Sequence, residues 1–216
     1  MKIGIIGSGI VGQTLAKGFA AEGHSVTLGT RDTAKEEVVK FKAENEGISI
    51  GDFAATAAFG ELIILAVGGT VTTEAIELSG KENFSNKVVI DATNPIAKEA
   101  PLNGVLKFFT DINQSLMEKI QAQIPEAKLV KAFNSTGSPT FYKPVFKGGT
   151  PTMFIAGNDD EAKKTVTEIL TSFGWETEDA GKAEAARAIE PLCMLWCISG
   201  FVKNDWYHAF KLLKAE

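Results

Sequence analysis

The residues that could do chemistry come first in the chain, as a glycine-rich turn over 7–12. Gly7, Gly9 and Gly12 stand at the spacing G-x-G-x-x-G. In such a turn the first glycine permits a tight bend, the second lets the backbone approach a pyrophosphate, and the third lets helix and strand pack closely. The helix that follows directs free N–H groups and a positive dipole end toward the phosphates. The motif predicts a dinucleotide site formed by Gly7, Ser8, Gly9, Ile10, Val11 and Gly12.

The elements on both sides of this turn have the pattern that the motif requires. The apolar run at 3–6 is typical of a buried parallel strand, and Leu15, Phe19 and Ala20 recur at helical spacing before Gly23 ends the helix. A second strand follows at 24–28. The alternative is a structural turn that binds no phosphate, but the β–α–β context favours the nucleotide site.

The end of the second expected strand indicates which nucleotide binds. An NAD site places an acidic residue there for the ribose hydroxyls, whereas an NADP site places an Arg for the 2′-phosphate. Here the strand runs into Thr30 and Arg31, and Lys35 follows. Asp32 lies twenty residues after Gly12, as the NAD acid often does, but it stands beyond the strand tip and is better explained as a helix N-cap. Thr30, Arg31 and Lys35 are therefore predicted NADP(H) ligands, and a solvated basic patch is the alternative.

The composition bounds the class of protein. The chain has 216 residues, 44% of them hydrophobic and 23% charged, with a net charge of -5. We expect one large domain, with or without a small partner, and the acidic balance argues against a nucleic-acid surface. Two cysteines, Cys193 and Cys197, and two histidines predict no metal site. The chain starts on a strand rather than on a signal peptide, so we expect a cytoplasmic location.

Strand and helix patterns alternate along the rest of the chain. Apolar runs predict central parallel strands at 62–67, 87–91 and 128–132. Polar or glycine-rich tips follow these runs at 68–70, 92–95 and 133–137. Because ligands of open α/β sheets lie outside the carboxyl ends of the strands, we expect these tips to hold the nicotinamide and the substrate. The residues predicted to contact the cofactor there are Ala66, Val67, Gly68, Thr93, Asn94 and Asn134.

This alternation predicts an α/β fold, a Rossmann-type, doubly wound, mostly parallel sheet with a short C-terminal helical part. Further helices are expected at 33–45, 113–124 and 159–173. We expect residues 1–180 to form the NADP-binding domain and residues 181–216 to form a helical segment that packs on the cleft or on a second subunit.

The C-terminal segment is unusually apolar. Residues 182–213 read as helix, and Pro191 is expected to kink or restart it. The run 192–202 is shorter than the ~20 apolar residues that span a bilayer, so no membrane segment is expected. Such a helix packs in the core or at a dimer interface, and we favour a homodimer. Arg187 and Glu190, three positions apart, are expected to pair with each other.

Several motifs together give the chain a resemblance to the NADPH-dependent coenzyme F-420 reductases, the deazaflavin-linked NADP oxidoreductases. The matching segments are the turn at 5–12, Thr30-Arg31 with Lys35, and the stretches 91–95, 130–134 and 185–192. The chain is also similar to the cytoplasmic domain of the six-transmembrane epithelial antigen metalloreductases. The resemblance implies a Rossmann domain with a short helical part, and hydride transfer between NADPH and a deazaflavin or flavin bound in the cleft.

Hydride transfer between two cofactor rings requires little acid–base help from side chains, so the catalytic residues stay unassigned. Asn134 and Thr93 are the candidates expected to hydrogen-bond the nicotinamide, whereas a lone His208 is more often structural. The expected partner is a small-molecule electron acceptor. Two alternatives remain: an NADP-dependent dehydrogenase of a small organic substrate, and a non-catalytic NADP sensor.

Overall fold

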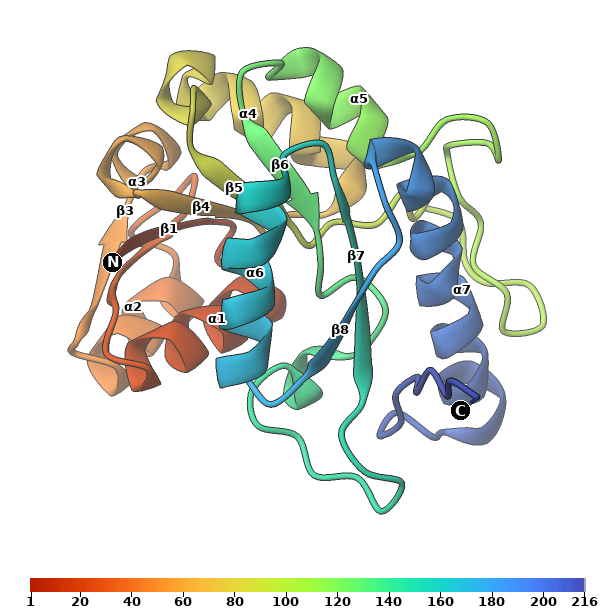
Figure 1. The fold of residues 1–216 in the computed structure, drawn as a ribbon. Helices are drawn as coiled ribbons and strands as arrows, with labels where there is room; N and C mark the ends of the chain where they lie inside the picture. The colour runs from red at the N-terminus through yellow and green to blue at the C-terminus, as the bar shows by residue number, and fades with distance from the viewer. Residues whose placement is uncertain (216) are drawn as a thin grey trace.

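Eight strands form one sheet in the computed structural model, which describes residues 1–215 (Figure 1). The strands are β1 (Lys2–Ile6), β2 (Ser25–Gly29), β3 (Ile48–Gly51), β4 (Leu62–Leu65), β5 (Val88–Asp91), β6 (Lys128–Lys131), β7 (Thr152–Gly157) and β8 (Glu176–Asp179). Their order is β3-β2-β1-β4-β5-β6-β7-β8. The first six are parallel, β7 runs antiparallel to β6, and β8 is parallel to β7. This is the predicted Rossmann-type sheet, in which the direction of winding reverses at β1 and β4.

Helices cover both faces of the sheet. One face carries α1 (Ile10–Ala21), α2 (Glu36–Glu44) and α6 (Asp160–Ser172). The other carries α3 (Phe53–Phe59), α4 (Thr72–Ser79), α5 (Leu116–Gln123) and α7 (Ala186–Lys203). Short 3₁₀ turns occur at Gly69–Val71, Lys81–Phe84, Ser138–Thr140 and Ala183–Ala185. The central strands are therefore buried on both sides, which explains their uninterrupted apolar runs.

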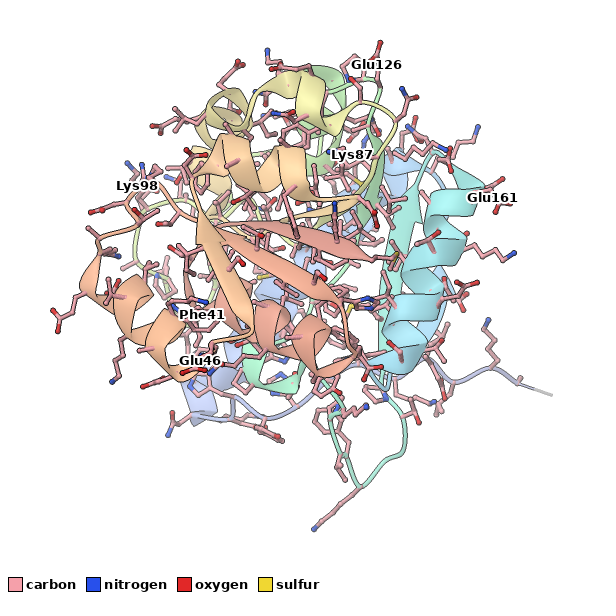
Figure 2. All side chains as sticks on the ribbon, turned by 90° about the vertical axis from the view of Figure 1, so that its left-hand side faces the viewer. Phe41, Glu46, Lys87, Lys98, Glu126 and Glu161 are labelled. Carbon is pink, nitrogen blue, oxygen red and sulfur yellow. The ribbon has the colours of Figure 1, made fainter. Side chains whose placement is uncertain are left out.

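Two apolar clusters fill the spaces between the sheet and its helices. On the α1 face, the ring of Phe19 lies 4.8 Å from that of Phe173 on the loop after α6, and Phe173 packs near Phe133 at 5.9 Å. Phe41 of α2 is buried on the same face, whereas Glu161 extends away from the outer side of α6 (Figure 2). These contacts hold α1, and hence the glycine turn before it, firmly against the sheet.

The C-terminal segment departs from the expectation of a helix to residue 213. α7 ends at Lys203, where Asn204 adopts a left-handed φ of 53°. The tail then turns back along the sheet, and the Phe210 carbonyl accepts a hydrogen bond of 2.8 Å from the Thr152 N–H. The tail also pairs Lys211 with Glu176 of β8. A left-handed residue ends a helix, and bonding to β7 replaces the helical bonds that the tail would otherwise make.

The helix α7 continues through Pro191, so the proline does not restart it, and the expected kink stays a prediction. The stretch Ala183–Lys203, with a mean hydropathy of 1.3, is long and apolar enough to cross a membrane by length and composition alone. Core helices of globular proteins meet the same criterion, and α7 contacts α5 and β7 and buries the charged Glu190 against the sheet. The division at residue 180 falls just after β8 and stays a prediction.

The start of α2 also differs from the sequence-based expectation. The predicted N-cap at Asp32 is wrong, because α2 begins at Glu36 with Lys35 as its N-cap. The Asp32 carboxylate accepts instead from the Ala34 N–H at 2.9 Å and closes a tight turn. Asp, like Asn, often bonds to the backbone two residues further on, which offers the chain a turn in place of a helix.

Candidate functional site

The glycine turn has the geometry of a phosphate-binding loop. Gly7 has a φ of +123°, and a Cβ there would lie 2.5 Å from the Ala66 carbonyl oxygen. A Cβ on Gly12 would lie 1.9 Å from the Gly7 carbonyl oxygen. Among the described residues, no heavy atom would lie within 4 Å of a Cβ on Gly9. Gly7 and Gly12 are therefore fixed by packing, whereas the space in front of Gly9 is open to a ligand.

The N-terminus of α1 faces the same space. Gly9 is its N-cap, and within residues 1–215 no side chain caps the helix and no acidic residue lies in its first turn. The first N–H groups of a helix have no partner within the helix, and the helix dipole favours a negative charge there. The Gln13 amide donates 2.9 Å to the Ser8 carbonyl oxygen and steadies the loop. The turn thus offers backbone donors and a positive dipole end to an anion.

A cavity of about 630 Å³ opens at the carboxyl ends of β1, β2 and β4. Its lining includes nine of the predicted site residues: Gly7, Ser8, Gly9, Thr30, Arg31, Lys35, Ala66, Val67 and Gly68. It also includes residues that the sequence reasoning missed, namely Asp32, Phe53, Val71, Glu74 and Ala75. The volume is within the range of about 300–1,000 Å³ typical of ligand sites. Ile10, Val11 and Gly12 build the helix behind this lining.

One end of the cavity is polar and carries the charged groups. The Ser8 hydroxyl donates 3.1 Å to the hydroxyl of Thr30, which is buried. Arg31 and Lys35 are more exposed, with 61% and 57% of their side chains accessible. Each lies near a carboxylate: Arg31 Nη1 is 3.9 Å from Glu74 Oε1, and Lys35 Nζ is 2.5 Å from Glu37 Oε2. Arg31 and Lys35 both line the cavity, as an anion site requires, and the carboxylates of Asp32 and Glu74 line it with them.

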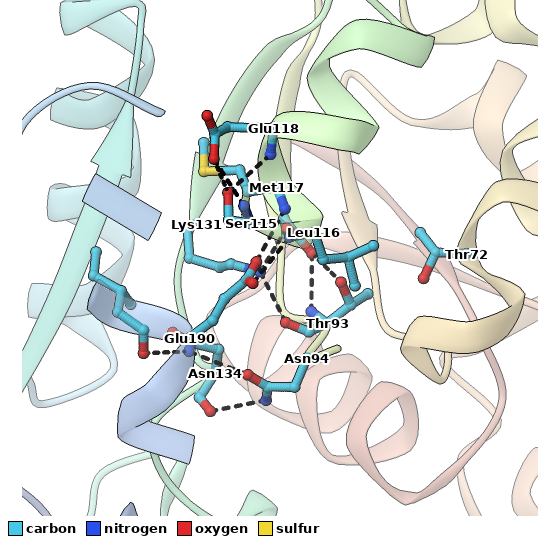
Figure 3. Close-up of polar contacts among 12 residues, drawn as sticks. Thr72, Thr93, Asn94, Ser115, Leu116, Met117, Glu118, Lys131, Asn134 and Glu190 are labelled. Atoms are coloured by element: carbon cyan, nitrogen blue, oxygen red, sulfur yellow. Dashed lines mark hydrogen bonds and ion pairs between the residues drawn. The ribbon is translucent and has the colours of Figure 1, made fainter. Parts of the chain in front are cut away.

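A buried polar network lies at the ends of β5 and β6 (Figure 3). The Lys131 ammonium is 2.7 Å from Asp91 Oδ2 and 2.9 Å from Glu190 Oε1, and it donates 2.8 Å to the Thr93 carbonyl oxygen. Burial by itself lowers the pKa of Lys131, but the carboxylates of Asp91 and Glu190 outweigh it and raise that pKa. The Lys131 ammonium is therefore held between two carboxylates and a backbone carbonyl oxygen.

Glu190 reaches from α7 to the start of α5. Its carboxylate accepts from the N–H groups of Leu116 and Met117, each at 2.9 Å. A negative charge at a helix N-terminus is stabilised by the N–H groups and by the dipole. The carboxylate of Glu190 thus joins α7, α5 and β6 at one buried point.

The expected pairing of Arg187 with Glu190 is wrong. Arg187 instead donates to Glu118 of α5, with Nη2 2.5 Å from Oε1 and Nε 3.0 Å from Oε2. Glu118 also forms a capping box with Ser115. The hydrogen bond from Arg187 lowers the pKa of Glu118 from 4.5 to about 2. Glu190 is not available to Arg187, because its carboxylate is bound to the start of α5 and to the Lys131 ammonium.

Thr93, Asn94 and Asn134 lie beside this network rather than in the lining of the cavity. The Thr93 hydroxyl donates 2.6 Å to Asp91, and the Asn94 amide donates 2.9 Å to the Asn134 carbonyl oxygen. Asn134 Nδ2 donates 3.0 Å to the Ile189 carbonyl oxygen. Asn134 Oδ1 is buried and has no hydrogen-bond partner among the described residues. Contact of these residues with a nicotinamide stays a prediction.

Metal ligands and disulfides give no further candidate. Within residues 1–215, no group of three or more His, Cys, Asp or Glu side chains is placed to hold a metal ion. Cys193 and Cys197 are free thiols on α7.

The fold and the cavity define a Rossmann-type dinucleotide-binding protein. Residues 2–95 match the family model described as "NADP oxidoreductase coenzyme F420-dependent". A solved structure of a candidate F420-dependent NADP-reductase from Arthrobacter sp. FB24 is 30% identical, with a TM-score of 0.91 over 99% of this chain and 100% of that chain. The chain belongs to this family of NADP-dependent oxidoreductases.

More distant relatives share the domain within longer proteins. The metalloreductase STEAP3 of Rattus norvegicus is 26% identical over 88% of this chain. The matched region is 36% of the length of that protein. An imine reductase from Aspergillus terreus in complex with NADPH4 is 14% identical and has a TM-score of 0.67, over 94% of this chain and 63% of its own. The latter likeness concerns the fold alone.

Proposed function

We propose that this chain transfers a hydride between NADPH and a deazaflavin or flavin-type acceptor. The observation that carries the proposal is the meeting of the glycine turn with Thr30, Arg31 and Lys35 in one cavity. A backbone cradle for the pyrophosphate and a cationic end for the 2′-phosphate are the two features that an NADP site needs. Membership of the family supports the same nucleotide.

The residues present fit that nucleotide. The open space at Gly9 and the uncapped start of α1 would accept the pyrophosphate. Arg31 offers a planar fork that suits a phosphate, and Lys35 adds a second positive charge. The end of β4 would line the cavity between the bound pyrophosphate and the nicotinamide, through Ala66, Val67 and Gly68.

Asn134 and Thr93 are proposed to orient the nicotinamide. Both follow central strands, β6 and β5, at the edge of the sheet where ligands of such folds bind. The buried Asn134 Oδ1, for which no described residue supplies a donor, supports an amide contact there. Since Thr93 is tied to Asp91 and its carbonyl to Lys131, the network would fix the strand tips against which the ring rests.

When bound, the nicotinamide and the acceptor ring supply the redox chemistry. The protein's part is then to bind the two rings, to hold them in register and to exclude water from between them. The buried network of Asp91, Lys131 and Glu190 suits this part because it is rigid and saturated with partners. The one proton that the reduced acceptor takes up besides the hydride can come from solvent, so no side chain is assigned to supply it.

The deazaflavin is the proposed acceptor because the family description and the Arthrobacter relative both name F420. The metalloreductase relative supports an electron acceptor more generally. Anaerobic NADPH oxidation by the purified protein, with coenzyme F-420, FMN and no acceptor run in parallel, tests the proposal. Turnover with the deazaflavin or the flavin supports it. Tight NADPH binding without turnover on any acceptor would favour the NADP sensor.

A homodimer formed through α7 and a cytoplasmic location are also proposed. Leu195, Phe201 and Val202 of α7 are exposed apolar side chains, which supports a second copy of the chain as their cover. Light scattering after size-exclusion chromatography tests the dimer, and Phe201→Asp is expected to yield monomers that still bind NADPH.

A further inference from the structure

Glu74 brings a negative charge into the cationic end of the cavity. It stands in the first turn of α4, across the cavity from the end of β2, and lines the cavity together with Arg31 and Lys35. The next acid on α4, Glu77, faces elsewhere: its Oε1 lies 2.8 Å from Lys81 Nζ and 3.1 Å from the Gln123 amide nitrogen. The two glutamates are therefore alike in charge and helix but differ in what they face.

Among the described residues, the acidic group nearest to the Arg31 guanidinium is the Glu74 carboxylate. Arg31 Nη1 lies 3.9 Å from Glu74 Oε1, and within residues 1–215 no other acidic group lies in ion-pair distance of Arg31. About three fifths of each side chain is exposed, 61% for Arg31 and 59% for Glu74. The pair is thus weak enough to break when a stronger anion arrives.

We propose that Glu74 is a specificity-determining residue that weakens binding of the 2′-phosphate, an inference that rests on the proposed NADP(H) site. A 2′-phosphate forms charge-assisted hydrogen bonds with a guanidinium and takes Arg31 from Glu74. The Glu74 carboxylate then loses its contact with Arg31. It also faces a phosphate that carries more than one negative charge, and the two anions repel each other. A nucleotide without the 2′-phosphate leaves the pair intact and is not opposed.

Glu74 therefore narrows the preference for NADP(H) over NAD(H) that Arg31 and Lys35 create. The effect of one exposed charge is modest: pairs of this kind correspond to about 0.2–1 kcal/mol, which is up to about fivefold in a dissociation constant. A weaker hold on the 2′-phosphate also speeds the release of the used nucleotide, since changes in affinity within one site act mostly on dissociation.

Isothermal titration of the full chain with 2′,5′-ADP (adenosine 2′,5′-bisphosphate) and with 5′-AMP tests this inference. These probes differ by the 2′-phosphate alone. Glu74→Gln is expected to tighten 2′,5′-ADP binding about two- to fivefold and to leave 5′-AMP binding within about 1.5-fold. Glu77→Gln is the matched control, because it removes the same charge from the same helix outside the cavity.

The outcomes separate this inference from the proposed function. If the wild-type protein binds 2′,5′-ADP and Glu74→Gln leaves its affinity unchanged or weakens it, the role of Glu74 is wrong and the NADP(H) site stands. An equal gain with Glu77→Gln would also overturn it, because the effect would then be one of net charge. If the wild-type protein binds neither 2′,5′-ADP nor NADPH, the NADP(H) site itself is wrong.

Discussion

The Glu190 carboxylate of α7 lies 2.9 Å from the Lys131 ammonium of β6, and both side chains are buried. The same carboxylate caps α5 through the N–H groups of Leu116 and Met117. One acidic side chain thus fastens the last helix to the sheet beside the ends of β5 and β6.

Replacing Glu190 by Gln should destabilise the fold strongly. The amide would turn an N–H group toward a backbone donor or toward Lys131, and the ammonium would lose one of its two carboxylates. Breaking a buried pair by removing one partner costs about 3–5 kcal/mol, so we expect a loss of about 3 kcal/mol in the free energy of unfolding in urea. Glu184→Gln, an exposed neighbour that removes the same charge, should change it little. Equal stabilities for the two variants would contradict this role of Glu190.

The pair between Glu118 and Arg187 should make stability depend on acid pH. The pKa of Glu118 is lowered to about 2 in the folded protein from 4.5. A carboxyl group whose folded pKa is depressed contributes stability above its unfolded pKa, and the contribution disappears as the pH falls through the folded pKa. Thermal unfolding between pH 5 and pH 2 should therefore show a steeper fall in Tm for the wild type than for Glu118→Gln. Glu126→Gln is the exposed control, and parallel curves for wild type and Glu118→Gln would count against the pair.

The Gly9→Ala substitution should separate binding from folding. Its Cβ would enter the open space in front of the turn, so the protein should fold with a Tm near that of the wild type. NADPH affinity should fall about tenfold or more, because the methyl group would part the phosphate from its N–H donors and such charged hydrogen bonds contribute about 1.5–3 kcal/mol. Gly47→Ala, also open but outside the cavity, is the control. Full NADPH affinity in Gly9→Ala would mean that the pyrophosphate binds elsewhere.

Arg31→Ala should reduce NADPH affinity much more than NADH affinity. The guanidinium is proposed to bind the 2′-phosphate, a group that NADH lacks. Loss of charge-assisted hydrogen bonds predicts a change of about tenfold in the ratio of the two dissociation constants. Lys119→Ala, which removes an exposed cation on α5, should leave the ratio unchanged. Equal losses for both nucleotides would undo the assignment of Arg31.

The parts of the site that neighbouring residues determine were predictable from the sequence. The strand, turn and helix around Gly9, and the approach of Thr30 and Lys35 to it, follow from local periodicity and from the rule that ligands lie at strand ends. Glu74 was not predicted because it comes from α4, which is distant in sequence from the glycine turn and from β2. No pattern within α4 indicates that Glu74 lines the cavity. The start of α4 just after the glycine tip of β4 is the signal that could have found it.

The contacts of α7 were mispredicted for a similar reason. Helical spacing can pair Arg187 only with residues of its own helix, such as Glu190. The actual partner of Arg187 lies on α5, and Glu190 contacts α5 and β6. The end of the helix at Lys203 depends on Asn204 and on the return of the tail to Thr152, a contact between distant segments. Tertiary bonds of this kind override local propensity.

Deuterium transfer under anaerobic, single-turnover conditions tests the proposed hydride transfer most directly. The protein would be mixed with NADPH carrying deuterium at the transferred position of its nicotinamide and with oxidised coenzyme F-420. The reduced deazaflavin would then be analysed by mass spectrometry. Direct hydride transfer predicts that the deuterium appears on the deazaflavin, where a carbon-bound label is retained, and that NADH reacts far more slowly. Reduction of the deazaflavin without deuterium would contradict direct hydride transfer, and failure of both coenzyme F-420 and FMN to become reduced would contradict the account.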